Sequence, residues 1–145
     1  MAKPSCRDYT SSNERKIESL RWAMNARIVL ADDHEIVRSG IRSLLDGHHP
    51  WVVCGEAENG KEAVEKVLSL KPELVVLDLS MPVMNGIEAA REIRKKAPAT
   101  KIVIFSMHDS PRIAEEAVQA GADAYLAKTA HFSELEKVIS SLLKQ

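Results

Sequence analysis

Short apolar runs alternate with longer amphipathic stretches along most of the chain. The runs are rich in Val, Ile and Leu, and runs this short and this apolar predict strands that are buried on both faces. Between them, apolar residues recur at the i, i+4, i+8 spacing of an amphipathic helix. The predicted strands are 28–31, 51–57, 74–77, 101–105 and 123–127, and the predicted helices are 34–45, 61–70, 85–97, 111–121 and 133–144.

Residues that start or stop helices mark the ends of these segments. Gly47 and Gly121 follow the first and fourth helices, whereas Pro72 and Pro98 end the second and third. Pro111 suits the first turn of the fourth helix, where its missing N–H costs nothing. The apolar spacing predicts one buried side on the first helix, made by Ile36, Val37, Gly40, Ile41, Leu44 and Leu45.

The order of the segments predicts an α/β fold. Strand–helix units joined by short connections favour parallel strands with helices on both faces. Right-handed crossovers leave few topologies, and a domain of this size favours the doubly wound, five-stranded flavodoxin-like order 2-1-3-4-5. The switch point of such a sheet lies between strands 1 and 3. We therefore expect a ligand site there, at the carboxyl ends of the strands.

Polar residues end four of the predicted strands. Asp32 and Asp33 follow the first strand, and Asp78 follows the third. Ser106 ends the fourth strand and Lys128 the fifth. Because parallel strands end at one edge of the sheet, these groups are expected to share a crevice. Such a set of groups suits the handling of a phosphoryl group with a divalent cation.

Three carboxylates in one crevice would repel one another strongly. Two unit charges ~4 Å apart cost about 4 kcal/mol at an effective dielectric constant near 20. Such a cluster persists only with a compensating cation or with raised pKa values. Oxygen ligands with open positions suit Mg²⁺, with Mn²⁺ as an alternative. In this arrangement Asp78 is the natural nucleophile, while Lys128 and Ser106 would bind phosphoryl oxygens.

Taken singly, each group has a simpler explanation. Asp33 or Asp78 alone would most often cap a helix, and Ser106 alone would be a cap or turn residue. Lys128 alone would be a solvated charge, and Tyr125 a strand aromatic. The joint placement at successive strand ends is what favours a functional site. The histidines show no metal-ligand spacing, so structural or solvated roles are expected for His34, His48, His49, His108 and His131.

Composition narrows the classes of function. The chain has 145 residues, enough for one domain with a core, and its net charge of -1 gives no electrostatic footprint for nucleic acid bound by this chain itself. No segment has the ~20 apolar residues of a membrane span, and no signal peptide pattern opens the chain. Cys6 and Cys54 lack a C-x-x-C spacing, which fits a reducing cytoplasm. Residues 1–26 are expected to be a flexible or weakly helical extension before a domain over 27–145.

The strand-end residues belong to longer motifs. These are 29–34 (VLADDH), 76–82 (VLDLSMP), 85–86 (NG), 105–106 (FS) and 120–128 (AGADAYLAK). Together they make the chain from 27 to about 143 resemble the receiver domain of bacterial two-component response regulators, which has a CheY-like fold. The phrase with His34 and the Met-Pro and Asn-Gly steps resemble the NarL/FixJ branch most. Its members usually carry a LuxR-type helix-turn-helix after the receiver.

The resemblance implies a phosphoacceptor site. Asp78 would take a phosphoryl group from a phosphohistidine on a sensor histidine kinase. Enzymatic activity would be limited to this self-catalysed transfer and to autodephosphorylation. Mg²⁺ would be bound directly by Asp33 and Asp78, and by Asp32 through water. The backbone carbonyl of Ser80 would complete the ligand set.

The resemblance also implies a conformational switch. Lys128 and Ser106 would bind the phosphoryl group. Ser106 and Tyr125 would form the switch pair, with the hydroxyl moving inward and the ring following. The surface of the fourth helix, fifth strand and fifth helix would pass the signal on, commonly through a homodimer. No membrane partner is implied, and a cytoplasmic location is expected.

Two positions depart from the family pattern. Thr129 follows Lys128 where many receivers have a proline after a cis peptide bond, so the isomer of this bond stays open. Met107 follows Ser106 where a small residue is common in the family. The bulk of Met107 is expected to narrow access to Asp78 and to slow small phosphodonors.

Other classes of function fit the sequence less well. A phosphohydrolase of the haloacid dehalogenase type needs a second Asp two residues after the nucleophile, where Ser80 stands. A nucleotide- or flavin-binding module needs a glycine-rich phosphate loop, and neither G-x-G-x-x-G nor G-x-x-x-x-G-K occurs. Within the receiver interpretation, a stand-alone receiver acting by protein contacts remains an alternative to the front part of a DNA-binding transcription regulator. The NarL/FixJ-like motifs favour the latter.

Overall fold

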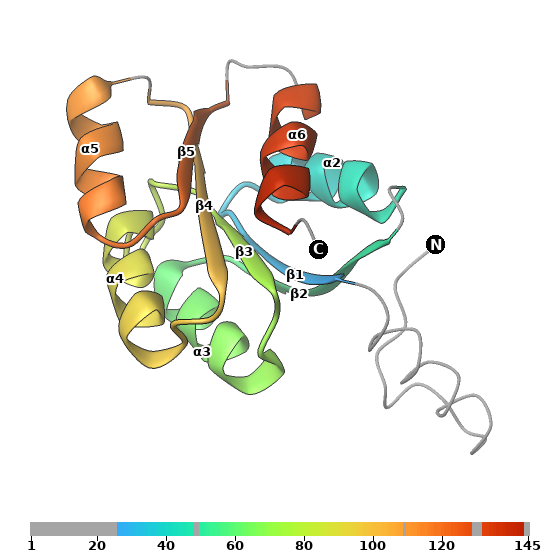
Figure 1. Cartoon of the computed structure of the whole chain (residues 1–145), viewed down its shortest axis with the longest axis horizontal. Coiled ribbons are helices and arrows are strands. Elements are labelled where there is room, and N and C mark those ends of the chain that lie inside the picture. Colours follow the sequence, from blue (N-terminus) through green and yellow to red (C-terminus); the bar gives the residue numbers. More distant parts are fainter. Residues whose placement is uncertain (1–25, 48–49, 109, 129–131, 144–145) are drawn as a thin grey trace.

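The computed structural model describes residues 26–47, 50–108, 110–128 and 132–143. They form a five-stranded parallel sheet in the order β2-β1-β3-β4-β5, which confirms the predicted flavodoxin-like topology (Figure 1). The strands are β1 (Ala26–Ala31), β2 (Trp51–Ala57), β3 (Leu74–Leu77), β4 (Lys101–Ser106) and β5 (Ala124–Ala127). The helices are α2 (Glu35–Asp46), α3 (Gly60–Leu70), α4 (Gly86–Lys96), α5 (Pro111–Gln119) and α6 (Phe132–Leu142).

Some predictions fall on residues outside these ranges. They concern the extension up to residue 25, Cys6, the histidines 48, 49 and 131, and the peptide bond between Lys128 and Thr129. β1 begins at Ala26, one residue before the predicted domain boundary.

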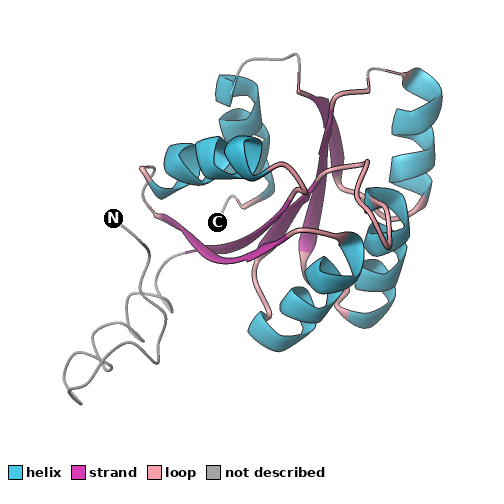
Figure 2. Cartoon of the chain, turned by 180° about the vertical axis from the view of Figure 1, so that it is seen from behind, coloured by secondary structure: helices cyan, strands magenta, loops and turns pink. Residues whose placement is uncertain are grey.

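Helices cover both faces of the sheet. Figures 1 and 2 show α2 and α6 on one face and α3, α4 and α5 on the other. One apolar cluster includes Ile41 of α2 and Ile139 of α6, and a second includes Val67, Ile93 and Ala117 of the other three helices. Because both faces are covered, the strands themselves can be almost wholly apolar. Within the described ranges, every helix is too short or too polar to cross a membrane.

Local capping signals explain where three helices begin. The Asn59 side chain caps α3, and Asn85 caps α4 in a reciprocal capping box with Glu88. Ser110 caps α5 directly before Pro111, which occupies the first turn as predicted. The last turn of α4 is basic, and positive charge is favourable at a helix C-terminus.

The predicted buried side of α2 is wrong at Ile36 and Gly40. Ile36 is 87% exposed and Gly40 is exposed, whereas Ile41 and Leu45 are fully buried and Val37 packs against their cluster. Successive residues of a helix are rotated by about 100° about its axis, so residues four apart form a stripe along one side. A sheet that covers one such stripe leaves the neighbouring stripe in solvent. The stripe through residues 37, 41 and 45 faces the sheet. Ile36 starts the adjacent one.

The ends of β1 and β3 lie side by side. Ala31 pairs with Leu77 at the last step of the ladder, and the Asp78 N–H donates to the Ala31 carbonyl at 2.9 Å. This hydrogen bond extends the parallel pairing by one residue beyond the strands. It places Asp32 and Asp33 next to Asp78 at the predicted switch point.

Candidate functional site

The structure brings the predicted acids together in one small volume. Ligand atoms of Asp32, Asp33, His34 and Asp78 all lie within 4.8 Å of one another. Asp32 and Asp78 are 1% and 4% exposed, whereas Asp33 lies at the opening. Neither Asp33 nor Asp78 is a helix cap, because the N-cap residue of α2 is His34 and that of α4 is Asn85. These carboxylates are therefore available to a ligand.

Lys128 is buried beside two of these acids. Its Nζ lies 2.6 Å from an Asp32 oxygen and 3.2 Å from an Asp78 oxygen, and its side chain is only 6% exposed. The Lys128 N–H also donates to the Ser106 carbonyl at 2.6 Å, which ties the β5 end to the β4 end. The long side chain thus reaches past β4 to the ends of β3 and β1. A solvated role for Lys128 is excluded.

Burial raises the pKa of Asp78. The loss of solvation is the largest cause, the Asp32 charge adds to it, and the attraction and hydrogen bonding of Lys128 oppose both. A smaller raising effect comes from Asp33. One ammonium therefore does not compensate for the three carboxylates around it. A further positive charge at this site would stabilise the ionised form of Asp78.

Backbone and side-chain contacts hold the loop that carries the acid pair. The His34 N–H donates to Asp32 Oδ1 at 2.8 Å. The Arg38 guanidinium donates to the Asp32 carbonyl at 2.6 Å and pairs with Glu56 of β2 at 2.8 Å. Arg42 contacts the same Glu56 carboxylate. The acid loop is thus tied to both α2 and β2.

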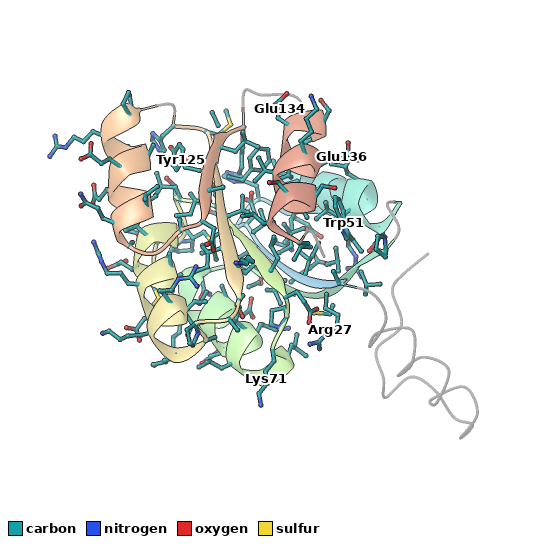
Figure 3. All side chains as sticks on the ribbon, in the orientation of Figure 1. Arg27, Trp51, Lys71, Tyr125, Glu134 and Glu136 are labelled. Atoms are coloured by element: carbon teal, nitrogen blue, oxygen red, sulfur yellow. The ribbon has the colours of Figure 1, made fainter. Side chains whose placement is uncertain are left out.

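The predicted switch residues meet the same backbone segment. Ser106 is fully buried, and its Oγ accepts a hydrogen bond from the His108 N–H at 3.0 Å. The Tyr125 hydroxyl donates to the His108 carbonyl. Tyr125 lies on the edge strand β5 (Figure 3). Ser106 therefore acts as a turn residue in this structure, as its simpler explanation predicted. The turn at His108 also connects Ser106 to Tyr125.

Gly86 brings the start of α4 against the backbone of Asp78. A Cβ at this position would lie 2.3 Å from the Asp78 carbonyl oxygen, and the Gly86 N–H donates to the Leu79 carbonyl at 2.8 Å. The Asn-Gly step is thus a helix start that needs a residue without a Cβ. Ser80 and Asp33 both line an adjoining open cleft of about 580 Å³. Ser80 Oγ also lies 3.3 Å from His108 Nε2.

The pattern of the response regulator receiver domain matches residues 28–140. The chain belongs to this family. The sheet topology described above is therefore that of a receiver domain, and the similar proteins include response regulators of the LuxR/NarL type.

Three similar proteins illustrate this receiver type. The nitrate/nitrite response regulator NarL of Escherichia coli K12 is 39% identical over 114 residues, covering 79% of this chain and 53% of NarL. The response regulator VraR of Staphylococcus saprophyticus is 36% identical over 116 residues, covering 80% of this chain and 56% of VraR. A solved LuxR-family response regulator from Aurantimonas sp. SI85-9A1 is 40% identical with a TM-score of 0.79, covering 82% of this chain and 85% of that one. The chain thus spans about half the length of these two curated relatives.

Sequence reasoning missed two residues of this receiver site. His34 was expected to be structural or solvated, and its side chain is 66% exposed, but its ring also lies beside Asp32 and Asp33. Arg38 was not considered, although it binds the backbone of Asp32. The position of His34 directly after the acid pair was an available signal. Met107 is 66% exposed, and its effect on access to Asp78 stays a prediction.

Proposed function

We propose that this chain accepts a phosphoryl group on the Asp78 carboxylate from a phosphohistidine of a sensor histidine kinase. One observation carries the proposal. The Asp78 carboxylate, at the carboxyl end of β3, lies 3.2 Å from the buried Lys128 ammonium and within 4.8 Å of the Asp32 and Asp33 oxygens. This is a nucleophile beside both a cation and a set of hard metal ligands.

The residues present suit Mg²⁺. Asp33 and Asp78 would bind it directly, Asp32 through water, and Ser80 through its backbone carbonyl. Their oxygens are hard ligands, their excess negative charge calls for a cation, and Asp33 is exposed enough to admit a hydrated ion. When bound, Mg²⁺ would neutralise charge on the phosphoryl oxygens.

The transfer itself is a substitution at phosphorus. An Asp78 oxygen forms the new bond to phosphorus while the bond from phosphorus to the donor nitrogen breaks, and its electron pair stays with the donor imidazole. Lys128 offers N–H donors to a phosphoryl oxygen from the position where it now contacts Asp78. We expect no catalysis on other substrates beyond this transfer and the later hydrolysis of the acyl phosphate.

The proposed switch uses the turn at His108. An acyl phosphate carries up to about two negative charges in place of the single charge of the ionised carboxylate, so phosphorylation adds about one negative charge at this site. The Ser106 hydroxyl, now accepting from the His108 N–H, would turn to donate to a phosphoryl oxygen, which breaks the bond to His108. Because the same peptide segment holds the Tyr125 hydroxyl, the ring of Tyr125 is released with it. The population shifts by the difference in interaction energy between the two arrangements.

The proposed output is a change at the surface of α5, β5 and α6. Val118 of α5 and Phe132 of α6 expose 57% and 47% of their surface. Phosphorylation would favour a homodimer, and a DNA-binding domain beyond this chain would then control transcription. The LuxR/NarL-type relatives, about twice as long as the matched region, support this output over a stand-alone receiver. We expect the chain to act in the cytoplasm, where kinases have ATP.

The test is phosphorylation of the purified chain with acetyl phosphate and Mg²⁺, followed by mapping of the acyl phosphate by mass spectrometry. The label should be on Asp78 and should disappear when Mg²⁺ is chelated. Asp78→Asn should abolish it, whereas Asp46→Asn, the same change on α2, should leave it intact. Label on another residue, or label on Asp78 that persists without Mg²⁺, would refute the proposal.

A further inference from the structure

Arg38 of α2 holds the backbone between the two acids of the pair. Its Nη1 donates to the Asp32 carbonyl oxygen at 2.6 Å, and its Nε donates to Glu56 Oε1 of β2 at 2.8 Å. Only 12% of the Arg38 side chain is exposed. The donors of a guanidinium lie in one rigid plane, so these two contacts together fix the orientation of the group.

The Asp32 carbonyl belongs to the peptide unit that leads into Asp33. Because this unit is planar, the carbonyl oxygen and the Asp33 Cα move as one body. The Asp32 N–H donates to the Ala57 carbonyl of β2 at 3.0 Å. The Asp32 backbone is thus held by β2 on both sides, directly at its N–H and through Arg38 at its carbonyl. The direction in which the Asp33 side chain leaves the chain depends on this peptide plane.

Asp33 needs such support more than the other two acids do. The carboxylates of Asp32 and Asp78 are buried and contact Lys128, whereas the Asp33 carboxylate lies at the opening and contacts the exposed ring of His34. Its place in the acid cluster therefore depends mainly on the backbone that carries it.

The effect of Arg38 on Asp33 is geometric rather than electrostatic. Glu56 also pairs with Arg42 from the next turn of α2, and Arg42 pairs with Asp46. Two positive and two negative side chains thus compensate one another beside the acid loop. We propose that Arg38 is a positioning residue, which holds the Asp32–Asp33 peptide so that the Asp33 carboxylate is ready to bind the divalent ion. The inference rests on the proposed function of the pocket and assigns part of it to a residue outside the acid cluster.

Backbone ¹⁵N relaxation of the full chain, with a metal chelator, tests this role without metal or phosphoryl transfer. The order parameter of the Asp33 amide should be about 0.85 in the wild type, as in rigid backbone, and should fall toward about 0.6 in Arg38→Met. Arg38→Lys should lower it as well, because an ammonium cannot replace a planar group that holds two acceptors. Arg42→Met is the matched control, which removes a contact to the same Glu56 carboxylate and should leave the Asp33 amide unchanged.

The second readout is the Mg²⁺ dependence of Asp78 labelling by acetyl phosphate. Both Arg38 variants should raise the Mg²⁺ concentration at half-maximal rate by about ten-fold, because a misplaced ligand weakens ion binding. The rate at saturating Mg²⁺ should approach that of the wild type, because the bound ion restores the position of Asp33. Arg42→Met should match the wild type in both quantities.

An Asp33 amide that neither Arg38 variant changes would overturn the inference, as would an equal change in Arg42→Met. Wild-type behaviour of Arg38→Lys would show that the charge is sufficient and would overturn the positioning role. If Arg38→Met does not fold, Arg38→Lys carries both readouts. A wild type that is not labelled on Asp78 refutes the proposed function. A labelled wild type whose Asp33 amide is unaffected by the Arg38 variants refutes only the role of Arg38.

Discussion

Replacing Lys128 by methionine tests the electrostatic balance of the pocket. Methionine has a similar length and removes the charge without adding a polar group. The change leaves the buried carboxylates of Asp32 and Asp78, now 2.6 and 3.2 Å from the ammonium, with no described lysine or arginine side chain in contact. Both carboxylates are almost wholly buried, so solvent screens them only weakly once the lysine charge is gone.

The expected cost follows from this burial. Removing one partner of a buried ion pair costs about 3 to 5 kcal/mol. Asp33 keeps the pocket partly open, with a side-chain exposure of 32%, so we expect the lower end, about 3 kcal/mol. In a domain of this size each kcal/mol shifts the melting temperature by about 4 °C, which predicts a decrease of about 12 °C.

Urea unfolding with a metal chelator at neutral pH measures this cost. Lys137→Met is the matched control, because Lys137 of α6 is 74% exposed and its contact with Glu134 is 3.6 Å long. That change should cost less than about 0.5 kcal/mol. Mg²⁺ at ten times its dissociation constant for the Lys128 variant should stabilise that variant by about 1.4 kcal/mol, and the same concentration should stabilise the wild type by less. Equal costs for both lysines, or a Lys128 cost unaffected by Mg²⁺, would refute the reasoning.

Three further predictions concern the same region. Because the pKa of Asp78 is raised in the fold, ionisation of this carboxyl destabilises the folded state at pH values above its ordinary pKa of 3.8. Asp78→Asn should therefore increase the free energy of unfolding at neutral pH without Mg²⁺. Urea titrations should show this gain fading as the pH falls through the raised pKa toward 3.8. Gly86→Ala should lower the free energy of unfolding by about 3 kcal/mol, because its Cβ would meet the Asp78 carbonyl. Gly40→Ala, whose Cβ would have no atom within 4 Å, should raise the free energy of unfolding by about 1 kcal/mol. Calorimetry that ranks the two variants otherwise contradicts the packing argument. Ser106→Ala should keep phosphorylation of Asp78 but weaken the conformational response, and equal phosphorylation-induced dimerisation in variant and wild type by light scattering would count against the switch.

Local sequence patterns were sufficient to predict the strands and helices and their order along the chain. The run Leu74–Leu77 is fully buried in β3 as its composition predicts, and β2 matches its predicted bounds at both ends. The prediction for α2 failed at Ile36, because apolar spacing defines a stripe only to within a neighbouring residue. The way α2 packs on β1, β2 and α6 decides which stripe is covered and which is left in solvent.

The candidate site was predictable as a set of residues but not as a geometry. Placement after strands identified Asp78 and Lys128, because parallel strands end at a common edge. The distance between Asp78 and Lys128 depends on the conformation of the Lys128 side chain, which passes the end of β4 to reach Asp78. The position of His34 depends on the start of α2, which sequence spacing did not resolve to one residue.

The sequence by itself determined the strand order and the chemical groups that gather at one edge of the sheet, since both follow from local periodicity and from the handedness of strand–helix–strand units. Only the tertiary structure decided that Lys128 is buried between two acids, that burial raises the pKa of Asp78, and that an imidazole joins the cluster. Desolvation and distances of a few ångströms arise from packing between segments far apart in the chain. A pattern along the chain carries no measure of that packing.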